Sequence, residues 1–231
     1  MLGLGFGLAG TSYNGAGYLP TDADGLHAWY KNGVGVSVGA WEDASSNSNV
    51  ASAASGNEVE AVVDGGLDFE GTNSDFLDFN QVTFSGAFTL FWVINMESYS
   101  TQNTIFGKGS TNTQFLEMQS LTQMRFKSGS ATSIFKFGGP ENFPLDAKYL
   151  ITVTRDGDGN MKIYKNGSEL SQVNSTGLPN TGGFIIDSLG IRNDSDRAFD
   201  GIMYEVILYT EEKTGDELSS LHSYLTGKFG L

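Results

Sequence analysis

The sequence contains no cysteine, and only two histidines, His27 and His222. A disulfide framework and a thiolate metal site are therefore excluded, so stability must come from a packed core or from assembly. Neither histidine lies in a metal-ligand spacing or near a plausible nucleophile motif. We expect His222, which falls in a predicted helix, to be a surface or packing residue.

Basic residues are also few. Lys and Arg together number 13 against 27 Asp and Glu, which gives a formal net charge of −14. No cluster of Lys and Arg is long enough to form a stripe that follows a phosphate backbone. We therefore expect neither nucleic acid nor an anionic membrane surface as a partner.

Long apolar runs are missing as well. No run approaches the roughly 20 apolar residues that span a bilayer, so we expect a soluble protein or part of a soluble assembly. The opening "MLGLGFGLAG" lacks the basic start and the continuous apolar core of a secretory signal, because the first basic residue is Lys31 and glycine interrupts the segment. We expect it not to be a cleaved leader.

Glycine and aromatic residues are abundant. The 231 residues include 31 Gly, 16 Phe, 9 Tyr and 3 Trp, a mixture that suits a sheet protein with many turns. The length fits one main domain. We therefore predict a Gly/Leu-rich N-terminal arm over residues 1–20 and one folded domain over residues 21–231.

Alternating apolar residues predict the strands. In "AFTLFWVINM" one face carries Phe88, Leu90, Trp92 and Ile94 and the other carries Phe91 and Val93, which predicts a central strand covered on both sides. The segment 149–170 predicts two strands joined by a tight turn at Asp156-Gly-Asp158-Gly-Asn160. Further strands are predicted in residues 103–109, 114–120, 123–129, 133–138, 184–194 and 201–210.

One helix is predicted near the C-terminus. Thr214 and Glu217 form a capping-box pattern, and Lys228 stands near the last turn, where a cation suits the helix dipole. The apolar residues that follow at helical spacing are Leu218, Leu221, Leu225 and Phe229.

In order, these pieces resemble a known family. "LHAWYKNGVGV", "VGAWEDASSNSN", "LDFEGTNSDFLDF", "TIFGKG" and the segment from Phe199 to Leu231 are similar to successive parts of a concanavalin A-like domain of the laminin-G and pentraxin type, over residues 24–231. The resemblance implies an all-β fold: a two-sheet antiparallel jelly-roll sandwich, with the short C-terminal helix and the extended N-terminal arm added to it. The layout, including the Gly/Leu-rich start, also resembles structural proteins of tailed phages, where such domains occur on capsid surfaces, fibres and tail appendages.

The sequence argues against an enzyme. One branch of this superfamily hydrolyses β-glucans with carboxylates spaced as E-x-D-x-E or E-x-D-x-x-E on one strand, and no such triplet occurs here. The nearest acidic residues lie in a Gly-rich turn region, where we expect solvated loops; they are Asp64, Asp68, Glu70, Asp75 and Asp78.

Calcium is the one cofactor that the resemblance suggests, because laminin-G and pentraxin relatives often bind it through carboxylates and loop carbonyls. The candidate ligands are Asp75 and Asp194. The family motif D-E-V is replaced by Tyr204-Glu205-Val206, so one family carboxylate is missing. The Asp156 turn has calcium-loop spacing but lacks the distal glutamate, and a plain hairpin turn is the preferred interpretation.

Carbohydrate binding would use exposed aromatic platforms, for which the candidates are Tyr13, Tyr18 and Tyr99. The sequons at Asn166, Asn174 and Asn193 are interpreted as turn chemistry rather than as glycosylation sites.

The opening segment bears on function. Leu2, Leu4, Phe6 and Leu8 alternate with glycine, so an extended backbone can lie close to a partner and pair with a sheet edge. We predict a docking arm, with a disordered or removed leader as the alternative. The leading hypothesis is a non-enzymatic, multi-copy or homo-oligomeric protein on the surface of a phage virion, with other virion proteins as partners. The alternative is an extracellular lectin-like module that binds host surface glycans.

Overall fold

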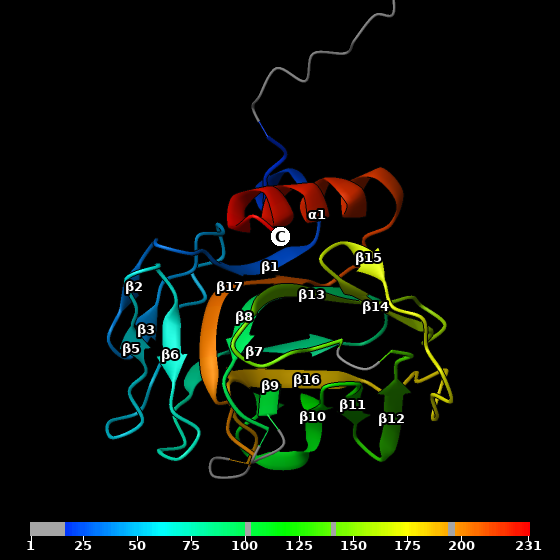
Figure 1. The fold of residues 1–231 in the computed structure, drawn as a ribbon, viewed down its shortest axis with the longest axis horizontal. Helices are drawn as coiled ribbons and strands as arrows, with labels where there is room; N and C mark the ends of the chain where they lie inside the picture. Colours follow the sequence, from blue (N-terminus) through cyan, green and yellow to red (C-terminus); the bar gives the residue numbers. More distant parts are fainter. Residues whose placement is uncertain (1–16, 100–102, 140–141, 194–196) are drawn as a thin grey trace, which may run out of the picture.

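The computed structural model describes residues 17–99, 103–139, 142–193 and 197–231. They form two antiparallel sheets packed face to face, with one helix lying across the outside of the first sheet (Figure 1). The predicted arm residues Leu2, Leu4, Phe6 and Leu8 lie outside the described residues, as does Asp194.

The first sheet has eight strands and is called the helix-side sheet below. Its strand order is β15 (Ser168–Glu169), β14 (Met161–Lys165), β13 (Lys148–Arg155), β8 (Phe88–Met96), β17 (Gly201–Tyr209), β6 (Leu67–Phe69) and β5 (Glu60–Ala61), and β1 (Leu26–Tyr30) also pairs with β17.

The second sheet has nine strands and is called the open-side sheet. Its order is β12 (Ala131–Lys136), β11 (Gln123–Ser128), β10 (Thr111–Ser120), β9 (Asn103–Lys108), β16 (Phe184–Leu189), β7 (Leu77–Phe84), β4 (Ala51–Ser52), β3 (Ala40–Trp41) and β2 (Val36–Ser37). A short 3₁₀ turn, η1 (Pro20–Asp22), precedes β1.

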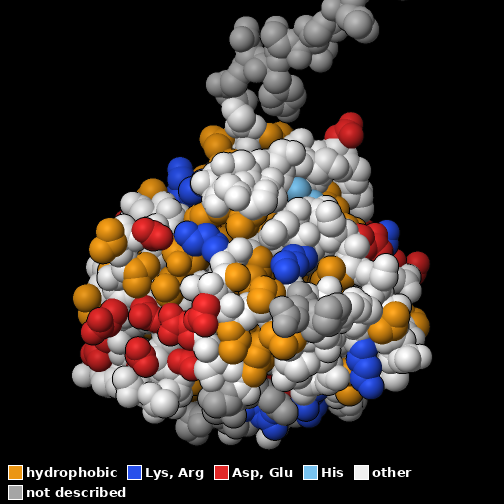
Figure 2. All heavy atoms as spheres, in the orientation of Figure 1, with side chains coloured by type: hydrophobic (Ala, Val, Ile, Leu, Met, Phe, Trp, Pro, Cys, Tyr) orange, Lys and Arg blue, Asp and Glu red, His pale blue; other side chains and the backbone are white. Residues whose placement is uncertain are grey.

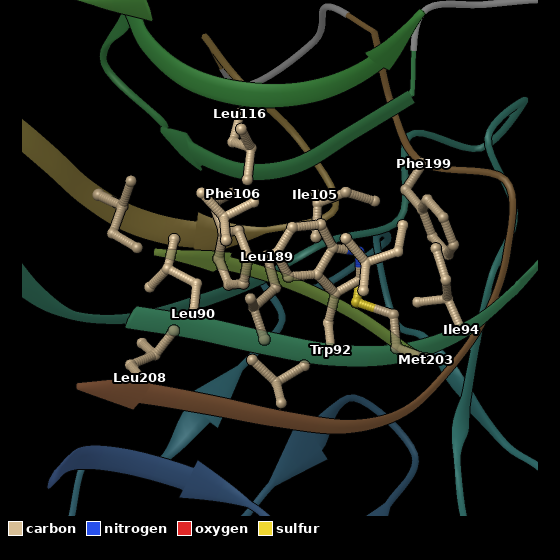
Figure 3. Packing of buried hydrophobic residues seen from close by; sticks show 14 of the residues in the cluster. Leu90, Trp92, Ile94, Ile105, Phe106, Leu116, Leu189, Phe199, Met203 and Leu208 are labelled. Carbon is tan, nitrogen blue, oxygen red and sulfur yellow. The ribbon is translucent and has the colours of Figure 1, made fainter. Parts of the chain in front are cut away.

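Strand β8 confirms the prediction of a central strand buried on both faces. It lies between β13 and β17, and Leu90, Trp92 and Ile94 enter the core between the sheets (Figure 3). Trp92 meets Phe106 of the opposite sheet edge to face, with ring centroids 5.4 Å apart. On the other face, Phe91 and Val93 are buried beneath the helix. The strand is therefore apolar throughout because both of its faces are covered.

Helix α1 (Gly215–Phe229) confirms the predicted C-terminal helix. Its residues Leu218, Leu221 and Leu225 are buried against the helix-side sheet. Thr214 is the N-cap residue, but its side chain makes no capping hydrogen bond, so the predicted capping box is wrong. Glu217 faces Lys213 instead, at 3.6 Å between Nζ and Oε2. The Glu217 side chain therefore takes part in an ion pair at the start of the helix.

The predicted turns are confirmed. Asp156 accepts hydrogen bonds from the backbone N–H groups of Asp158 and Asn160, at 2.9 and 2.8 Å, between β13 and β14. Asn166, Asn174 and Asn193 all adopt positive φ, of 49°, 53° and 53°, which is the backbone region that asparagine tolerates in tight turns.

The described chain begins on the helix side of the molecule. Tyr18 packs beside the cluster under α1, and Tyr209 donates its hydroxyl to the carbonyl of Pro20 at 2.8 Å. Tyr18 and Pro20 are thus held against the helix side of the molecule, opposite the open-side sheet (Figure 1). Within the described ranges, no helix combines the length and the apolarity that a membrane crossing requires.

Candidate functional site

The outer face of the open-side sheet is a broad surface that α1 does not cover (Figure 1). A short loop, residues 190–193, lies over its centre. A Cβ atom placed on Gly107 would come within 2.0 Å of the carbonyl oxygen of Ile191, so glycine is required where the loop crosses β9. Ile191 packs there with Phe76 and Ala198. The loop divides the face into a β7–β16 side and a β10–β12 side.

A shallow hollow of about 270 Å³ lies on the β7–β16 side. Two carboxylates line it, Asp78 from β7 and Asp187 from β16, together with Phe79 and the β9–β10 turn residues Gly109 and Ser110. Asp187 accepts the backbone N–H of Gly109 at 2.8 Å, which fixes the carboxylate at the rim of the turn. Carboxylate oxygens and a serine hydroxyl are the groups that bind sugar hydroxyls.

A further polar contact involves Lys108, the residue before Gly109 of the lining. Lys108 donates to the side-chain oxygen of Gln81 at 2.6 Å, close to the start of the same turn. Asp78 is exposed, because alternation along β7 turns every second side chain to solvent while Leu77 and Phe79 face inward. The sequence prediction placed Asp78 in a solvated acidic loop; the structure places it on a strand, and Asp187 was not singled out. The sequence around each residue gives no sign that Asp78 and Asp187 lie close together. The pairing of β7 with β16 brings them together.

A larger groove, of about 650 Å³, lies along α1. Its lining includes Tyr18, which the sequence analysis named as a candidate aromatic platform, and Tyr224, with Asp216, Ser219, Ser220, Ser223 and Gly17. Because the groove borders Gly17, the first described residue, we place the candidate site on the sheet face instead. Tyr99, a second candidate platform, donates its hydroxyl to the carbonyl of Phe143 at 2.8 Å and packs against the core. Tyr13 lies outside the described residues.

Of the two calcium candidates, only Asp75 lies in the part of the chain that the structure describes. Asp75 is buried, and its carboxylate accepts the backbone N–H of Glu70 at 3.0 Å. No group of three or more metal-ligating His, Asp or Glu side chains occurs among the described residues. The expectation of a solvated loop is wrong for Asp75 because that hydrogen bond holds the carboxylate inside the turn.

Acidic side chains do gather elsewhere, at the end of the molecule that carries β5 and β6 (Figure 2). Burial raises the pKa of Asp68, and the neighbouring carboxylates of Glu70 and Glu60 raise it further. Burial likewise raises the pKa of Glu97, which Asp68 and Asp200 also influence. This cluster gives the surface a strongly negative pole on the side of β5 and β6.

Glu205 belongs to the Tyr204-Glu205-Val206 segment, which replaces the family motif D-E-V. Its contacts are structural ones. It is buried and accepts hydrogen bonds from the indole N–H of Trp29 at 2.8 Å and from the hydroxyl of Tyr224 at 3.1 Å, and Lys228 contacts it as well. These partners come from β1 and α1, so the carboxylate holds the helix onto the sheet.

The class of protein defined by this architecture is a lectin-like jelly roll. Residues 69–219 match the family model described as the concanavalin A-like lectin/glucanases superfamily, in its laminin G form. The match covers well over half of the chain, and the protein belongs to this family. Comparison with curated proteins gives no significant match.

Solved structures share the fold at low sequence identity. The binding domain of Paraclostridial Mosquitocidal Protein 1 gives a TM-score of 0.62 at 13% identity, over 90% of this chain and 53% of that one. A structure of botulinum neurotoxin type C, whose cell entry depends upon interaction with two ganglioside molecules, gives 0.57 at 15% identity, over 87% and 51%. A sialidase of Trypanosoma rangeli gives 0.54 at 17% identity, over 90% and 33%. The chain thus spans about half the length of the two toxin structures, and the likeness is one of fold.

Proposed function

We propose that this protein is a non-enzymatic glycan-binding module, and that its ligand lies on the outer face of the open-side sheet, at the hollow between Asp78 and Asp187. The observation that carries the proposal is the hollow itself. Two carboxylates, a hydroxyl and a tight turn converge on a sheet face that α1 does not cover, in a lectin-like fold. Binding of gangliosides by a neurotoxin of the same fold is consistent with it.

The chemistry of the hollow favours a sugar. Each carboxylate oxygen accepts hydrogen bonds from sugar hydroxyls, and the pair of oxygens on one Asp suits two adjacent hydroxyls. The N–H of Gly109 already orients Asp187, so less side-chain freedom is lost when a ligand binds. An open, shallow site also leaves room for a polymer chain to extend beyond the bound sugar.

Binding without turnover is part of the proposal. The carboxylate triplet of the glucanase branch is absent from the sequence, and Asp78 and Asp187 come from different strands. We therefore expect intact polymer after prolonged incubation. Released reducing ends above those of a buffer control would argue for a hydrolase.

The test uses a glycan array followed by calorimetry on the glycans that bind. Asp187→Asn keeps the size of the side chain but removes its charge, and we expect it to weaken binding about tenfold, as loss of a charge-assisted hydrogen bond does. Asp158→Asn, in the exposed β13–β14 turn, is the matched control and should bind normally. An array without any bound glycan, or equal binding by both variants, would count against the proposal.

A second proposal concerns where the module works. We propose that it is displayed in many copies on the surface of a tailed-phage particle, attached to other virion proteins through residues 1 to about 20; an extracellular module is the alternative. The resemblance in layout supports this, and so does geometry, because Gly17 lies on the helix side (Figure 1). Attachment there leaves the open-side sheet free for ligand.

Electron cryo-microscopy of the native assembly tests this second proposal. Density for residues 1–20 in contact with another protein of the particle is the expected result. A free monomer with no contact through those residues would contradict it, and glycan binding would then remain as the function of an independent module.

A further inference from the structure

The end of the molecule that carries β2 and β5 exposes three valines. β2 is the last strand of the open-side sheet and β5 is the last strand of the helix-side sheet, and the two contact each other. Val34, Val38 and Val63 are 41%, 67% and 105% exposed. The backbone N–H of Gly33 donates to the carbonyl of Gly65 at 2.9 Å, which joins the turn before β2 to the turn after β5. We call the three valines the valine patch.

Carboxylates border the valine patch. Gly35 and Gly39 each follow one of the valines in the chain, and each lies against a glutamate side chain. A Cβ atom on Gly35 would come within 2.3 Å of Glu42, and one on Gly39 within 3.1 Å of Glu58. Glu60 follows on β5. The three glutamates are exposed, and none of them makes an ion pair within the described ranges. This surface therefore favours a partner that carries cations around an apolar centre.

The opposite edge of the open-side sheet carries the reverse charge. Its terminal strand is β12, whose outward side chains include Lys136 and the half-buried Ile134. Lys127 of β11 lies on the same outer face, opposite Thr132. Val173 is 43% exposed beside them, and its backbone N–H donates to the carbonyl of Lys136 at 2.7 Å. Neither lysine makes an ion pair with another described residue. We call the two lysines with Ile134 and Val173 the lysine edge.

The valine patch and the lysine edge are complementary. Each has apolar side chains among charged ones, and the charges have opposite sign. Figure 2 shows acidic and hydrophobic side chains together at the left, where Figure 1 places β2 and β5, and basic side chains at the lower right, where it places β12. Because the two surfaces lie at opposite edges of a nine-stranded sheet, they cannot meet within one molecule. They can meet only between molecules.

Contact of the valine patch with itself is disfavoured. It would place Glu58 and Glu60 of two copies against one another, and like charges brought together in an interface are costly. The net charge of −14 also makes two copies repel each other at long range. At about 0.15 M salt this repulsion is screened beyond roughly 8 Å, so the groups in direct contact decide which surfaces pair.

We propose that the valine patch of one copy binds the lysine edge of a second copy, so that the chains assemble head to tail. The inference goes beyond the proposed glycan binding and does not depend on it. The hollow at Asp187 stays clear, because β7 and β16 lie in the middle of the sheet, away from both edges. A row of copies thus presents one hollow per copy, and several weak contacts with one polymer then add up through avidity.

Analytical ultracentrifugation of the full chain tests the proposal. The sedimentation coefficient should rise with protein concentration beyond that of a dimer, because a head-to-tail contact leaves one free valine patch and one free lysine edge. Association should be weakest at the lowest salt, where net repulsion reaches furthest, and stronger at about 0.15 M. A monomer at every concentration and every salt would overturn the inference.

Two charge-reversal variants locate the contact. Glu58→Lys, Glu60→Lys makes both surfaces basic, whereas Lys127→Glu, Lys136→Glu makes both acidic, so neither variant should assemble alone. An equimolar mixture of the two should assemble, because each variant then meets the opposite charge on the other. This recovery also separates a lost contact from a misfolded variant. A mixture that stays monomeric would contradict the pairing of these two surfaces.

A control variant separates local charge from overall charge. Glu211→Lys, Asp216→Lys lies on the helix side and changes the net charge as much as the reversal of the two glutamates does. It should assemble like the wild type. An equal loss of assembly in this control would reduce the effect to net charge and overturn the site.

The apolar part of the contact is tested at Val63. Val63→Ser should weaken the association constant about tenfold, as loss of one buried valine does. Val63→Leu keeps the apolar surface and should assemble normally. Equal association of the two variants would contradict a contact through the valine patch. Thermal unfolding checks that each variant is folded.

Two further outcomes are distinct. Normal assembly of Lys127→Glu, Lys136→Glu alone would overturn the head-to-tail contact, because the lysine edge would then take no part in it. A wild type that binds glycans as a monomer would overturn this inference and leave the proposed function in place. Assembly without any bound glycan would support this inference and count against the proposed function alone.

Discussion

Trp29 donates its indole N–H to the carboxylate of Glu205 across 2.8 Å, although 176 residues separate the two in sequence. Lys228 and Tyr224 of α1 contact the same carboxylate, and the ring of Trp29 meets that of Tyr224 edge to face at 6.1 Å. One buried acid thus joins the first strand, a central strand and the C-terminal helix.

Glu205→Gln should therefore destabilise the fold. The substitution leaves Lys228 without its buried counter-charge, and breaking a buried pair in this way typically costs about 3 kcal/mol. Urea denaturation measures the change. Glu169→Gln, in an exposed pair with Lys162 on β14 and β15, should cost less than about 1 kcal/mol. Similar costs for the two variants would show that the Glu205 network does not anchor the helix.

His222 should make stability depend on pH. Its Nε2 lies 3.0 Å from the hydroxyl of Thr152 between the rings of Phe91 and Tyr164, and burial lowers its pKa to about 4. The folded state then keeps His222 neutral while the unfolded state takes up a proton below its ordinary pKa near 6.5. Stability is full above pH 7 and falls between about pH 6.5 and 4, by at most about 3 kcal/mol.

The variant His222→Gln isolates this contribution. Free energies of unfolding are measured for both proteins at pH 7.5, 5.5 and 4. The difference between them should shrink as the pH falls, because only the wild type loses the histidine contribution. A constant difference would mean that His222 titrates alike in the folded and unfolded states.

Gly107→Ala should disturb the loop of residues 190–193, which lies over the outer face of the open-side sheet. The added methyl group would meet the carbonyl of Ile191, and overpacking of this kind costs about 1–3 kcal/mol. Gly183→Ala is the matched control, since a Cβ atom there meets nothing within 4 Å. Hydrogen exchange of the Arg192 amide reports whether the loop moves. An unchanged exchange rate together with unchanged stability would contradict the close packing of loop and strand.

Arg155 should not be replaceable by lysine. Its guanidinium group is buried and donates to three carbonyls, of Gly86, Gly182 and Phe84, at 2.7, 2.7 and 3.2 Å. Lysine carries a compact charge and cannot match this planar fork, so Arg155→Lys should lose about 2–3 kcal/mol. Chemical denaturation checks the loss, with the exposed Lys162→Arg as the control. Wild-type stability of Arg155→Lys would show that the three bonds contribute little.

Local patterns were sufficient for most elements of the fold. Strand β8 and helix α1 follow from apolar spacing, and the Asp156 turn follows from its glycines, because each depends on residues close together in sequence. The capping box at Thr214 failed although its spacing was right: the Thr214 side chain makes no capping hydrogen bond, and Glu217 pairs with Lys213. The jelly-roll sandwich was implied by the resemblance of the successive sequence motifs to a concanavalin A-like domain.

The candidate sites were decided by tertiary structure. Asp78 and Asp187 meet because β7 pairs with β16, and Glu117 meets Arg125 because β10 pairs with β11. In the sequence, basic residues are scattered and form no stripe, whereas strand alternation places Arg125 and Lys127 on one face of β11. The sequence by itself determined which segments become strands, helix and turns, since these depend on local periodicity. Which side chains face one another depends on contacts between residues distant in sequence, and only the folded chain brings those together.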